Sequence, residues 1–325
     1  MQYRSFADLA HIIATQGHRL PSDIDLIVGV PRSGLLAGNI LCLTRNLPLA
    51  DLDGFIAGRT LAAGWTKRQV PGLAQGAKPR HVLVVDDSIS SGRSMREARE
   101  KLLAAGLDVR MTFCAIFGLP NVDHPEADIV LERVALPRAF EWNIFHHKQL
   151  ERMCFDIDGV LCHDPDRSQN DDGEAYLTFL LEAPPLYRTT RRIGHLVTSR
   201  LEKYRPETEA WLERNGVEYD KLWMLDLPSA AERRRLGAHA AFKAEVYRKT
   251  DSILFVESEA LQAREIAALS RKPVLSVAEH RIVHGLDDRR TGAPARPVRP
   301  SLARRAYGRL KGAAKDMLQA GRPPS

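Results

Sequence analysis

The sequence contains no long hydrophobic run. Its longest apolar stretches, such as residues 26–30 and 82–85, are as long as a β-strand and far shorter than the roughly 20 residues that a membrane-spanning helix needs. The first ten residues are polar and show no apolar run followed by a small-residue cleavage site, so no export signal is visible. We therefore expect a cytoplasmic protein that is not integral to a membrane.

Cysteine is also scarce, since the chain of 325 residues contains four. They lie mostly within or beside apolar runs and show no paired metal-ligand spacing, which argues against both a zinc site and a disulfide scaffold. We expect reduced and mostly buried thiols at Cys42, Cys114, Cys154 and Cys162.

Acidic residues are few in the last part of the chain, where arginine and lysine are frequent, so the net charge of +6 comes mainly from this tail. From His284 onward Gly, Pro and Arg dominate, a composition that is typical of disorder. Apolar residues between Leu302 and Met317 leave open an amphipathic helix that contacts nucleic acid or an anionic membrane. A solvated tail is the favoured interpretation.

Short apolar runs rich in β-branched residues alternate with helical patterns, and this alternation occurs twice. It predicts an α/β protein with two Rossmann-like parallel-sheet domains and a flexible basic C-terminal tail. The length also favours two domains, because single cores stop growing at roughly 250–300 residues. We expect domains at residues 1–148 and 149–283 and the tail at 284–325.

The expected elements follow the apolar runs. Strands are expected at residues 26–30, 81–85, 109–117 and 129–134 in the first half, and at 152–155, 193–197, 252–256 and 273–277 in the second. Helices are expected at residues 35–44, 94–105, 206–215 and 261–270.

The first chemical motif spans residues 81–94 and consists of a buried strand, two acids, a small-residue loop and a helix start. Asp86 and Asp87 at the carboxyl end of the strand are suited to bind ribose hydroxyls. Free backbone N–H groups and hydroxyls at a helix N-terminus are suited to bind a phosphate. The residues proposed for this role are Ser90, Ser91, Gly92, Arg93 and Ser94. A generic strand-loop-helix unit is the structural alternative.

A second strand, turn and helix start lies upstream at residues 26–35. Backbone amides at Arg32, Ser33 and Gly34, together with the Arg32 guanidinium, could hold a pyrophosphate group. Pro31 and Gly34 could equally mark an ordinary turn.

These two segments resemble the phosphoribosyl pyrophosphate (PRPP) and pyrophosphate loops of type I phosphoribosyltransferases. The resemblance implies displacement of pyrophosphate from the anomeric carbon of PRPP by a nitrogenous, base-like acceptor, with Mg²⁺ as cofactor. It also implies a mobile catalytic loop at residues 58–78, in which Arg59, Lys67 and Arg68 are candidates to neutralise the diphosphate, with Lys67 as the catalytic residue. A plain solvated loop is the alternative. Phe140 or Trp142 could stack an acceptor base, although packing between the domains is the favoured role of both.

The second chemical motif lies at residues 153–161, where an apolar strand ends in Asp156, Ile157, Asp158 and Gly159. Two carboxylates two residues apart at a strand end can share one site, where one attacks phosphorus and the other moves protons. A Ca²⁺ loop is the alternative, but no further acids follow at EF-hand spacing.

This motif resembles the first motif of haloacid-dehalogenase-type (HAD) phosphatases, and later segments resemble that family's remaining motifs in order. The resemblance implies a nucleophile at Asp156, a general acid/base at Asp158 and a phosphate site at Thr198 and Ser199. Lys243 would neutralise the phosphoaspartate, with Lys249 as a weaker candidate. The implied Mg²⁺ ligands are Asp156, Asp158, Glu257 and Glu259, the last because Ser258 stands where a second acid is common.

Together the two resemblances predict a bifunctional enzyme that acts on PRPP and on a phosphorylated small-molecule metabolite. Phosphoribosyl transfer in the first domain would be followed by Mg²⁺-dependent phosphomonoester hydrolysis in the second. About forty residues separate the first two HAD-like motifs, so a large cap domain is not expected. The alternative is a regulatory protein that senses PRPP without transferring it. Whether the chain forms a homo-oligomer is left open.

Overall fold

The computed structural model describes residues 1–61 and 78–285. By its contacts the chain divides into two compact units, one of residues Gln2–Trp142 and one that begins at Asn143. Each unit is described by itself. The predicted loop residues Lys67 and Arg68 and the predicted tail after residue 285 lie outside the described residues.

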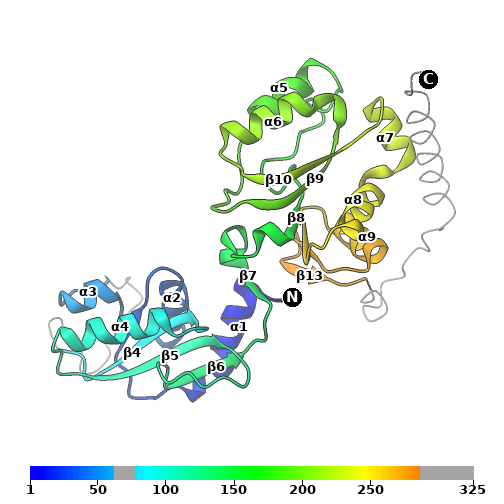
Figure 1. The fold of residues 1–325 in the computed structure, drawn as a ribbon. Helices are drawn as coiled ribbons and strands as arrows, with labels where there is room; N and C mark the ends of the chain where they lie inside the picture. Colours follow the sequence, from blue (N-terminus) through cyan, green and yellow to red (C-terminus); the bar gives the residue numbers. More distant parts are fainter. Residues whose placement is uncertain (62–77, 286–325) are drawn as a thin grey trace, which may run out of the picture. The chain divides into compact units, whose positions relative to one another are not determined.

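The first unit is built on a five-stranded sheet in which all neighbouring strands are parallel (Figure 1). The strand order is β3-β2-β4-β5-β6. The strands are β2 (Leu26–Gly29), β3 (Leu49–Asp51), β4 (His81–Ser88), β5 (Arg110–Gly118) and β6 (Ile129–Arg133). A small separate sheet pairs β1 (Gln2–Arg4) with β7 (Arg138–Phe140).

Helices bury both faces of this sheet, which explains why its strands read as continuous apolar runs. Along β4, Leu83 and Val85 pack in one core cluster, whereas Val82 and Val84 pack in the other. The first cluster includes residues of α1 (Phe6–Gln16) and α2 (Ser33–Arg45), and the second includes residues of α3 (Leu52–Ile56) and α4 (Arg93–Ala104).

The second unit contains a six-stranded sheet of order β10-β9-β8-β11-β12-β13, in which only the β12–β13 pair is antiparallel. The strands are β8 (Met153–Phe155), β9 (Ile193–Leu201), β10 (Tyr219–Leu225), β11 (Leu254–Glu257), β12 (Val274–Ser276) and β13 (Arg281–Val283). The helices are α5 (Glu174–Glu182), α6 (Arg205–Arg214), α7 (Ala230–Leu236), α8 (Ala238–Lys249) and α9 (Ala260–Ser270).

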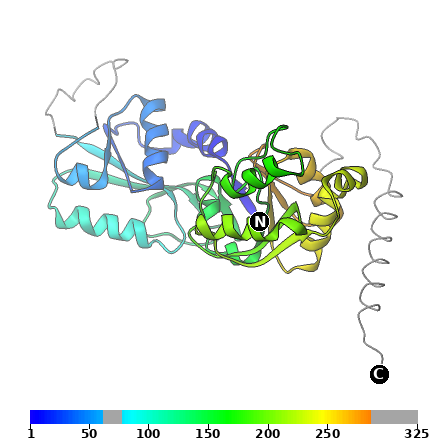
Figure 2. The ribbon, with the colours of Figure 1, turned by 90° about the horizontal axis from the view of Figure 1, so that it is seen from above.

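Helix α5 packs on α6, and α8 packs on α9 (Figures 1 and 2). Four short 3₁₀ turns complete the described structure, at Gly17–Arg19, Glu141–His146, Leu150–Arg152 and Glu202–Tyr204. None of the described helices combines the length and apolar character that a membrane crossing requires. Cys114, Cys154 and Cys162 are buried, and Cys42 is half-buried.

The predicted parallel α/β architecture is confirmed, and every predicted strand and helix corresponds to an observed one. Because parallel strands end on the same edge of a sheet, the loop after β2 and the acids at the end of β4 share one edge in the first unit. The loop after β8 and the ends of β9 and β11 share one edge in the second. Both predicted chemical sites therefore lie at carboxyl edges, where ligands of open α/β sheets bind.

Candidate functional sites

The two predicted loops of the first unit meet at Gly34. Strands β2 and β4 are neighbours, with Gly29 opposite Val85, so α2 begins beside the end of β4. A Cβ on Gly34 would lie 2.6 Å from the Val85 carbonyl oxygen and 3.1 Å from Asp86 Oδ1. Only glycine allows this close approach. The structure therefore brings the pyrophosphate-type loop into contact with the acid pair.

The acid pair itself is buried. The backbone N–H of Asp87 donates to Asp86 Oδ1 at 2.9 Å, and both side chains are shielded from solvent. Burial, reinforced by the charge of Asp87, raises the pKa of Asp86 to about 8. No basic side chain lies within ion-pair distance of either acid among the described residues. Two carboxylates without an ion-pair partner favour a ligand that donates hydrogen bonds or carries a metal ion.

Trp142, predicted as a stacking or domain-packing residue, contacts the acid pair through its indole N–H. Its indole N–H donates to Asp87 Oδ2 at 2.8 Å, and its ring stacks on Phe140 with a centroid distance of 5.0 Å. Beneath the loop, the buried Arg138 donates to the carbonyl oxygens of Ile89 and Gly118. The Trp142 ring thus packs within the first unit, where its N–H orients the Asp87 carboxylate.

The two helices that follow the predicted loops start without a side-chain cap. In α1 and α3, Ser5 and Asp51 accept a hydrogen bond from the first-turn backbone, whereas no side chain does so in α2 or α4. Their N-terminal N–H groups remain available to an anion, which the helix dipole favours. Of the loop residues proposed as ligands, Gly92 and Gly34 are buried, Ser33 is half-buried and the others are exposed. The exposed members are Arg32, Ser90, Ser91, Arg93 and Ser94.

In the second unit, Lys243 connects two strand ends. Its ammonium donates to Asp156 Oδ2 at 2.6 Å and to Glu257 Oε2 at 2.7 Å, and all three side chains are buried. Asp156 directly follows β8, Glu257 ends β11, and Lys243 lies on α8. The predicted nucleophile, lysine and one metal ligand are therefore in contact. Lys249, the weaker lysine candidate, pairs with Glu245 instead.

One ammonium faces two acidic side chains in this cluster. Burial raises the pKa of Asp156, the Lys243 charge opposes this, and the charges of Glu257 and Asp158 add to it, so that the pKa of Asp156 is raised to about 8. Burial alone would lower the pKa of Lys243, but the two carboxylates hold it above its ordinary value, so the ammonium stays charged. A further cation beside Asp156 would favour the ionised form of this side chain.

Asp158 faces a partner that the sequence analysis did not identify. Arg200 is fully buried, and its Nε and Nη2 donate to both carboxylate oxygens of Asp158, at 2.7 Å for the shortest contact. The Arg200 Nη2 also donates to the Cys162 sulfur at 3.3 Å. Paired hydrogen bonds of this kind fix a carboxylate in one orientation.

Thr198 and Ser199 lie at the carboxyl end of β9 and are both buried. The Thr198 hydroxyl accepts from the backbone N–H of Arg200 at 3.2 Å. The Ser199 carbonyl accepts from Arg233 Nη1 at 2.7 Å, while the Ser199 hydroxyl has no partner among the described residues.

The predicted metal ligands do not all converge. The Glu259 carboxylate caps α9 through the backbone N–H groups of Leu261 and Gln262, and the Asp158 carboxylate is turned to Arg200. Within the described part, no three acid, histidine or cysteine side chains are grouped as a metal site. Asp156 and Glu257 remain, and both carry the hard oxygen donors that Mg²⁺ prefers. This donor set fits Mg²⁺ with Asp156 and Glu257 as its side-chain ligands.

Asp164 is a further acid that the sequence analysis missed. Gly159 has a φ of +72°, and a Cβ there would lie 2.4 Å from Ser258 Oγ and 2.6 Å from Asp164 Oδ2. The Asp164 carboxylate therefore lies beside Ser258. Burial, followed by the charges of Asp158 and Glu257, raises the pKa of Asp164.

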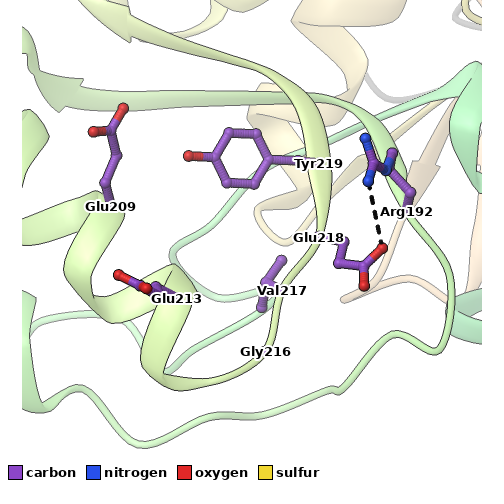
Figure 3. A pocket seen from close by; sticks show the side chains of 7 residues that line it. All are labelled: Arg192, Glu209, Glu213, Gly216, Val217, Glu218 and Tyr219. Atoms are coloured by element: carbon purple, nitrogen blue, oxygen red, sulfur yellow. Dashed lines mark ion pairs between the residues drawn. The ribbon is translucent and has the colours of Figure 1, made fainter.

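An open pocket in the second unit lies elsewhere (Figure 3). It is formed by the end of α6 and by residues at the amino ends of β9 and β10. Arg192 and Glu218 form an ion pair of 3.8 Å on its wall. Its lining residues are Arg192, Glu209, Glu213, Gly216, Val217, Glu218 and Tyr219. Because Asp156 and Glu257 lie at the carboxyl ends of their strands, this pocket is not part of that site.

Comparison with known proteins assigns the first unit. Residues 3–142 match the family model of the phosphoribosyl transferase domain. An orotate phosphoribosyltransferase of a Nocardioides species is 31% identical over 118 residues, which are 35% of this chain and 59% of that protein. The chain therefore spans less than two thirds of the length of this curated relative.

Solved structures of low similarity were also found. The xanthine-guanine-hypoxanthine phosphoribosyltransferase of Helicobacter pylori is 18% identical, with 44% of this chain and 92% of that chain covered and a TM-score of 0.32. A purine phosphoribosyltransferase of Pyrococcus horikoshii is 19% identical, with coverages of 43% and 92% and a TM-score of 0.31. The matched family model ends at Trp142, the last residue of the first compact unit. Residues 3–142 are thus a phosphoribosyltransferase domain of type I.

Proposed function

We propose that the first unit transfers the phosphoribosyl group of PRPP to a nitrogenous acceptor. In this reaction the bond from the anomeric carbon to pyrophosphate breaks, pyrophosphate leaves with the electron pair, a carbon–nitrogen bond forms and the acceptor releases a proton. Asp86 and Asp87 would accept hydrogen bonds from the ribose hydroxyls. The uncapped starts of α2 and α4 would bind the pyrophosphate and the sugar phosphate, respectively. Mg²⁺ bound with PRPP would offset the charge of the leaving group.

The observation that carries this proposal is the contact between Gly34 and Asp86, which joins two anion-binding loops at a buried acid pair. Lys67, with Arg59 and Arg68, is proposed to neutralise the pyrophosphate during transfer. Arg59 is exposed in the structure, and the other two lie outside the described residues.

The test of the first activity is PRPP binding followed by pyrophosphate release. Calorimetry with PRPP and Mg²⁺ should give binding in wild type and none in the variant with Asp86→Asn and Asp87→Asn. A variant with Asp108→Asn and Asp123→Asn has the same charge change at exposed positions and should bind as wild type does. Acceptors are then screened for pyrophosphate release, with orotate first because of the matched relative. Unchanged binding in the folded Asp86/Asp87 variant would refute the assignment.

We further propose that the second unit is a HAD-type phosphomonoesterase. Asp156 Oδ attacks phosphorus, the ester P–O bond breaks, and Asp158 donates a proton to the leaving oxygen and regains one from the water that attacks in the next step, which releases inorganic phosphate. Water then hydrolyses the phosphoaspartate and regenerates Asp156. Lys243 offsets the charge of nucleophile and phosphate, and bound Mg²⁺ would add to this neutralisation. The supporting observation is the Asp156–Lys243–Glu257 contact across two strand ends.

Turnover of p-nitrophenyl phosphate with Mg²⁺ tests this second activity. Asp156→Asn keeps the size of the side chain and should abolish turnover, whereas Asp251→Asn, at an exposed position, should not change it. Binding of BeF₃⁻ at Asp156 is a measurement that does not depend on the choice of substrate. Turnover by Asp156→Asn equal to that of wild type would rule out the phosphoaspartate. If both activities exist, they fit consecutive steps in which the second unit removes a phosphate from a phosphoribosyl product.

A further inference from the structure

A buried arginine in the second unit lacks a counter-ion. Arg233 on α7 has 7% of its surface exposed, and none of the described carboxylates lies within ion-pair distance of it. An arginine stays protonated at any pH that a folded protein tolerates. A buried charge without a partner costs several kcal/mol of stability. An anionic group of a ligand would supply the missing opposite charge.

The unsatisfied hydrogen-bonding groups lie together. Arg233 Nη1 donates to the Ser199 carbonyl at 2.7 Å, which anchors the guanidinium against the end of β9. Arg233 Nε has no hydrogen-bond partner among the described residues, and neither has Ser199 Oγ. Ser199 has 8% of its surface exposed. Two buried donors, one of them cationic, are thus left open at two residues in direct contact.

Neighbouring groups place this pair at the edge of the proposed phosphatase site. The pKa of His239 on α8 is lowered to about 4 by burial, then by the positive charges of Arg233 and Lys243. Arg233 also acts on Tyr176. Burial and the charge of Asp158 raise the pKa of Tyr176, and the charges of Arg200 and Arg233 lower it. The Arg233 charge thus acts both on His239, which Lys243 also affects, and on Tyr176, which Asp158 also affects. Thr198, the other proposed phosphate-binding residue, precedes Ser199 directly.

We propose that Arg233 and Ser199 form an oxyanion subsite that binds a phosphate group of the substrate. This inference rests on the phosphomonoesterase proposed above for the second unit. Arg233 Nε–H and the Ser199 hydroxyl donate to phosphate oxygens, and the substrate anion supplies the charge that the described protein lacks at this position. The substrate class is therefore an anionic phosphate compound. Neutral and cationic compounds should bind this buried cationic site less tightly.

The test follows the Arg233 Nε–H resonance in ¹⁵N-labelled full-length protein while inorganic phosphate is added without metal. Arg233→Lys assigns the resonance. The signal should move and saturate in wild type, and Ser199→Ala should weaken the affinity roughly two- to tenfold, as expected for one lost hydroxyl contact. Arg234→Met removes the same charge from an exposed neighbour and should leave the affinity unchanged. This readout is local, so phosphate bound in the first unit does not affect it.

Two results would overturn the subsite: an Arg233 signal that stays in place throughout the titration, or Arg234→Met weakening the affinity as much as Ser199→Ala. Failure of the phosphatase proposal is seen separately, as absent turnover in a protein whose Arg233 signal still saturates. A second titration in the presence of BeF₃⁻ shows which phosphate is bound. Loss of the shift assigns the subsite to the transferred phosphoryl group, and its persistence assigns it to a second anionic group of the substrate.

Discussion

Two acid clusters in this chain are buried, and they are stabilised differently at the level of single residues. In the second unit, Asp156 and Glu257 have a cation, Lys243, between them. In the first unit, Asp86 and Asp87 have the Trp142 indole as a hydrogen-bond donor but no ion-pair partner among the described residues. Burial raises the pKa of Asp86 and of Asp156 to about 8, so the Lys243 charge offsets only part of the cost of burying Asp156.

Asp86→Asn should therefore stabilise the protein at neutral pH while it removes PRPP binding. The pKa of Asp86 lies at about 8 in the folded protein and at 3.8 ordinarily. Between these values the folded state holds a proton that the unfolded chain has released. The free energy of unfolding then falls as pH rises, by about 1.4 kcal/mol per pH unit for one group, and asparagine removes this slope.

The measurement is urea unfolding of both proteins from pH 5 to 9. The free energy of unfolding of Asp86→Asn should increase relative to that of wild type as the pH rises to about 8, and the difference should stay constant above this pH. Asp108→Asn is the control, because its side chain is exposed. A difference between Asp86→Asn and wild type that is independent of pH would contradict the buried, protonated state of Asp86.

Arg200 should prove essential for the stability of the second unit because it is fully buried and paired with Asp158. Arg200→Met leaves the Asp158 carboxylate without its cation and should lower the free energy of unfolding by about 3 kcal/mol. Adding Asp158→Asn should restore part of this loss, because the unpaired charge is then gone. A double-mutant cycle measured by urea unfolding checks the coupling. Additive losses would show that the pair contributes nothing.

At the scale of elements, the turn between β2 and α2 is limited by space. Gly34→Ala places a methyl group 2.6 Å from the Val85 carbonyl, so the turn and β4 must separate. Overpacking of this kind costs about 1–3 kcal/mol. PRPP affinity should fall in parallel, since both loops belong to the proposed site.

Gly17→Ala is the matched control for this prediction. Gly17 has a helical φ of −58°, and a Cβ added there would meet no atom within 4 Å, so alanine fits without strain. It should stabilise the first unit by about 0.4–1 kcal/mol through the unfolded state. Thermal unfolding and PRPP calorimetry of both variants provide the comparison. Equal stability of the two alanine variants would contradict the close contact at Gly34.

The elements that the sequence predicted are those with continuous apolar runs. Strands such as β4 and β9 are buried on both faces, so each reads as an unbroken hydrophobic segment. Helices α7 and α8 were not predicted, since arginines fill the first and the buried face of the second includes Lys243. Strand β10, whose polar residues Asp220 and Lys221 are exposed near the sheet edge, was not predicted either.

The candidate sites were predictable only where local sequence carries the chemistry. Acids at strand ends and glycine-containing loops are local patterns, so Asp86, Asp156 and Gly34 could be named beforehand. Arg200, Arg233 and the contact of Trp142 with Asp87 could not, because each of these side chains binds a residue at least 34 positions away in the chain. Tertiary packing selects such partners, and no periodicity in the sequence indicates them.

At the scale of the whole molecule, each unit has a core of its own. Two hydrophobic clusters cover the two faces of the first sheet, and a separate cluster is formed by residues from Cys154 to Val283. A fragment of residues 1–142 should therefore fold cooperatively and bind PRPP with Mg²⁺. Calorimetric unfolding and a PRPP titration of this fragment are the test. A fragment that is soluble but unfolds without a cooperative transition would contradict independent folding.

Removal of the basic tail should affect neither unit. A chain that ends at Leu286 retains Gly285, where a Cβ would lie 2.5 Å from the Ala267 carbonyl on α9. The residues beyond are rich in Gly, Pro and Arg and cannot bury a core. The truncated chain should match full-length protein in melting temperature, PRPP affinity and phosphatase turnover. A lowered melting temperature would show that the tail packs on a unit.

Lys243 also has a consequence for the protein before any ligand arrives. Its ammonium donates hydrogen bonds to Asp156 after β8 and to Glu257 at the end of β11, and so holds the two strand ends together. The spacing of these strand ends is therefore held by a side chain of the chain itself and does not depend on a bound ion.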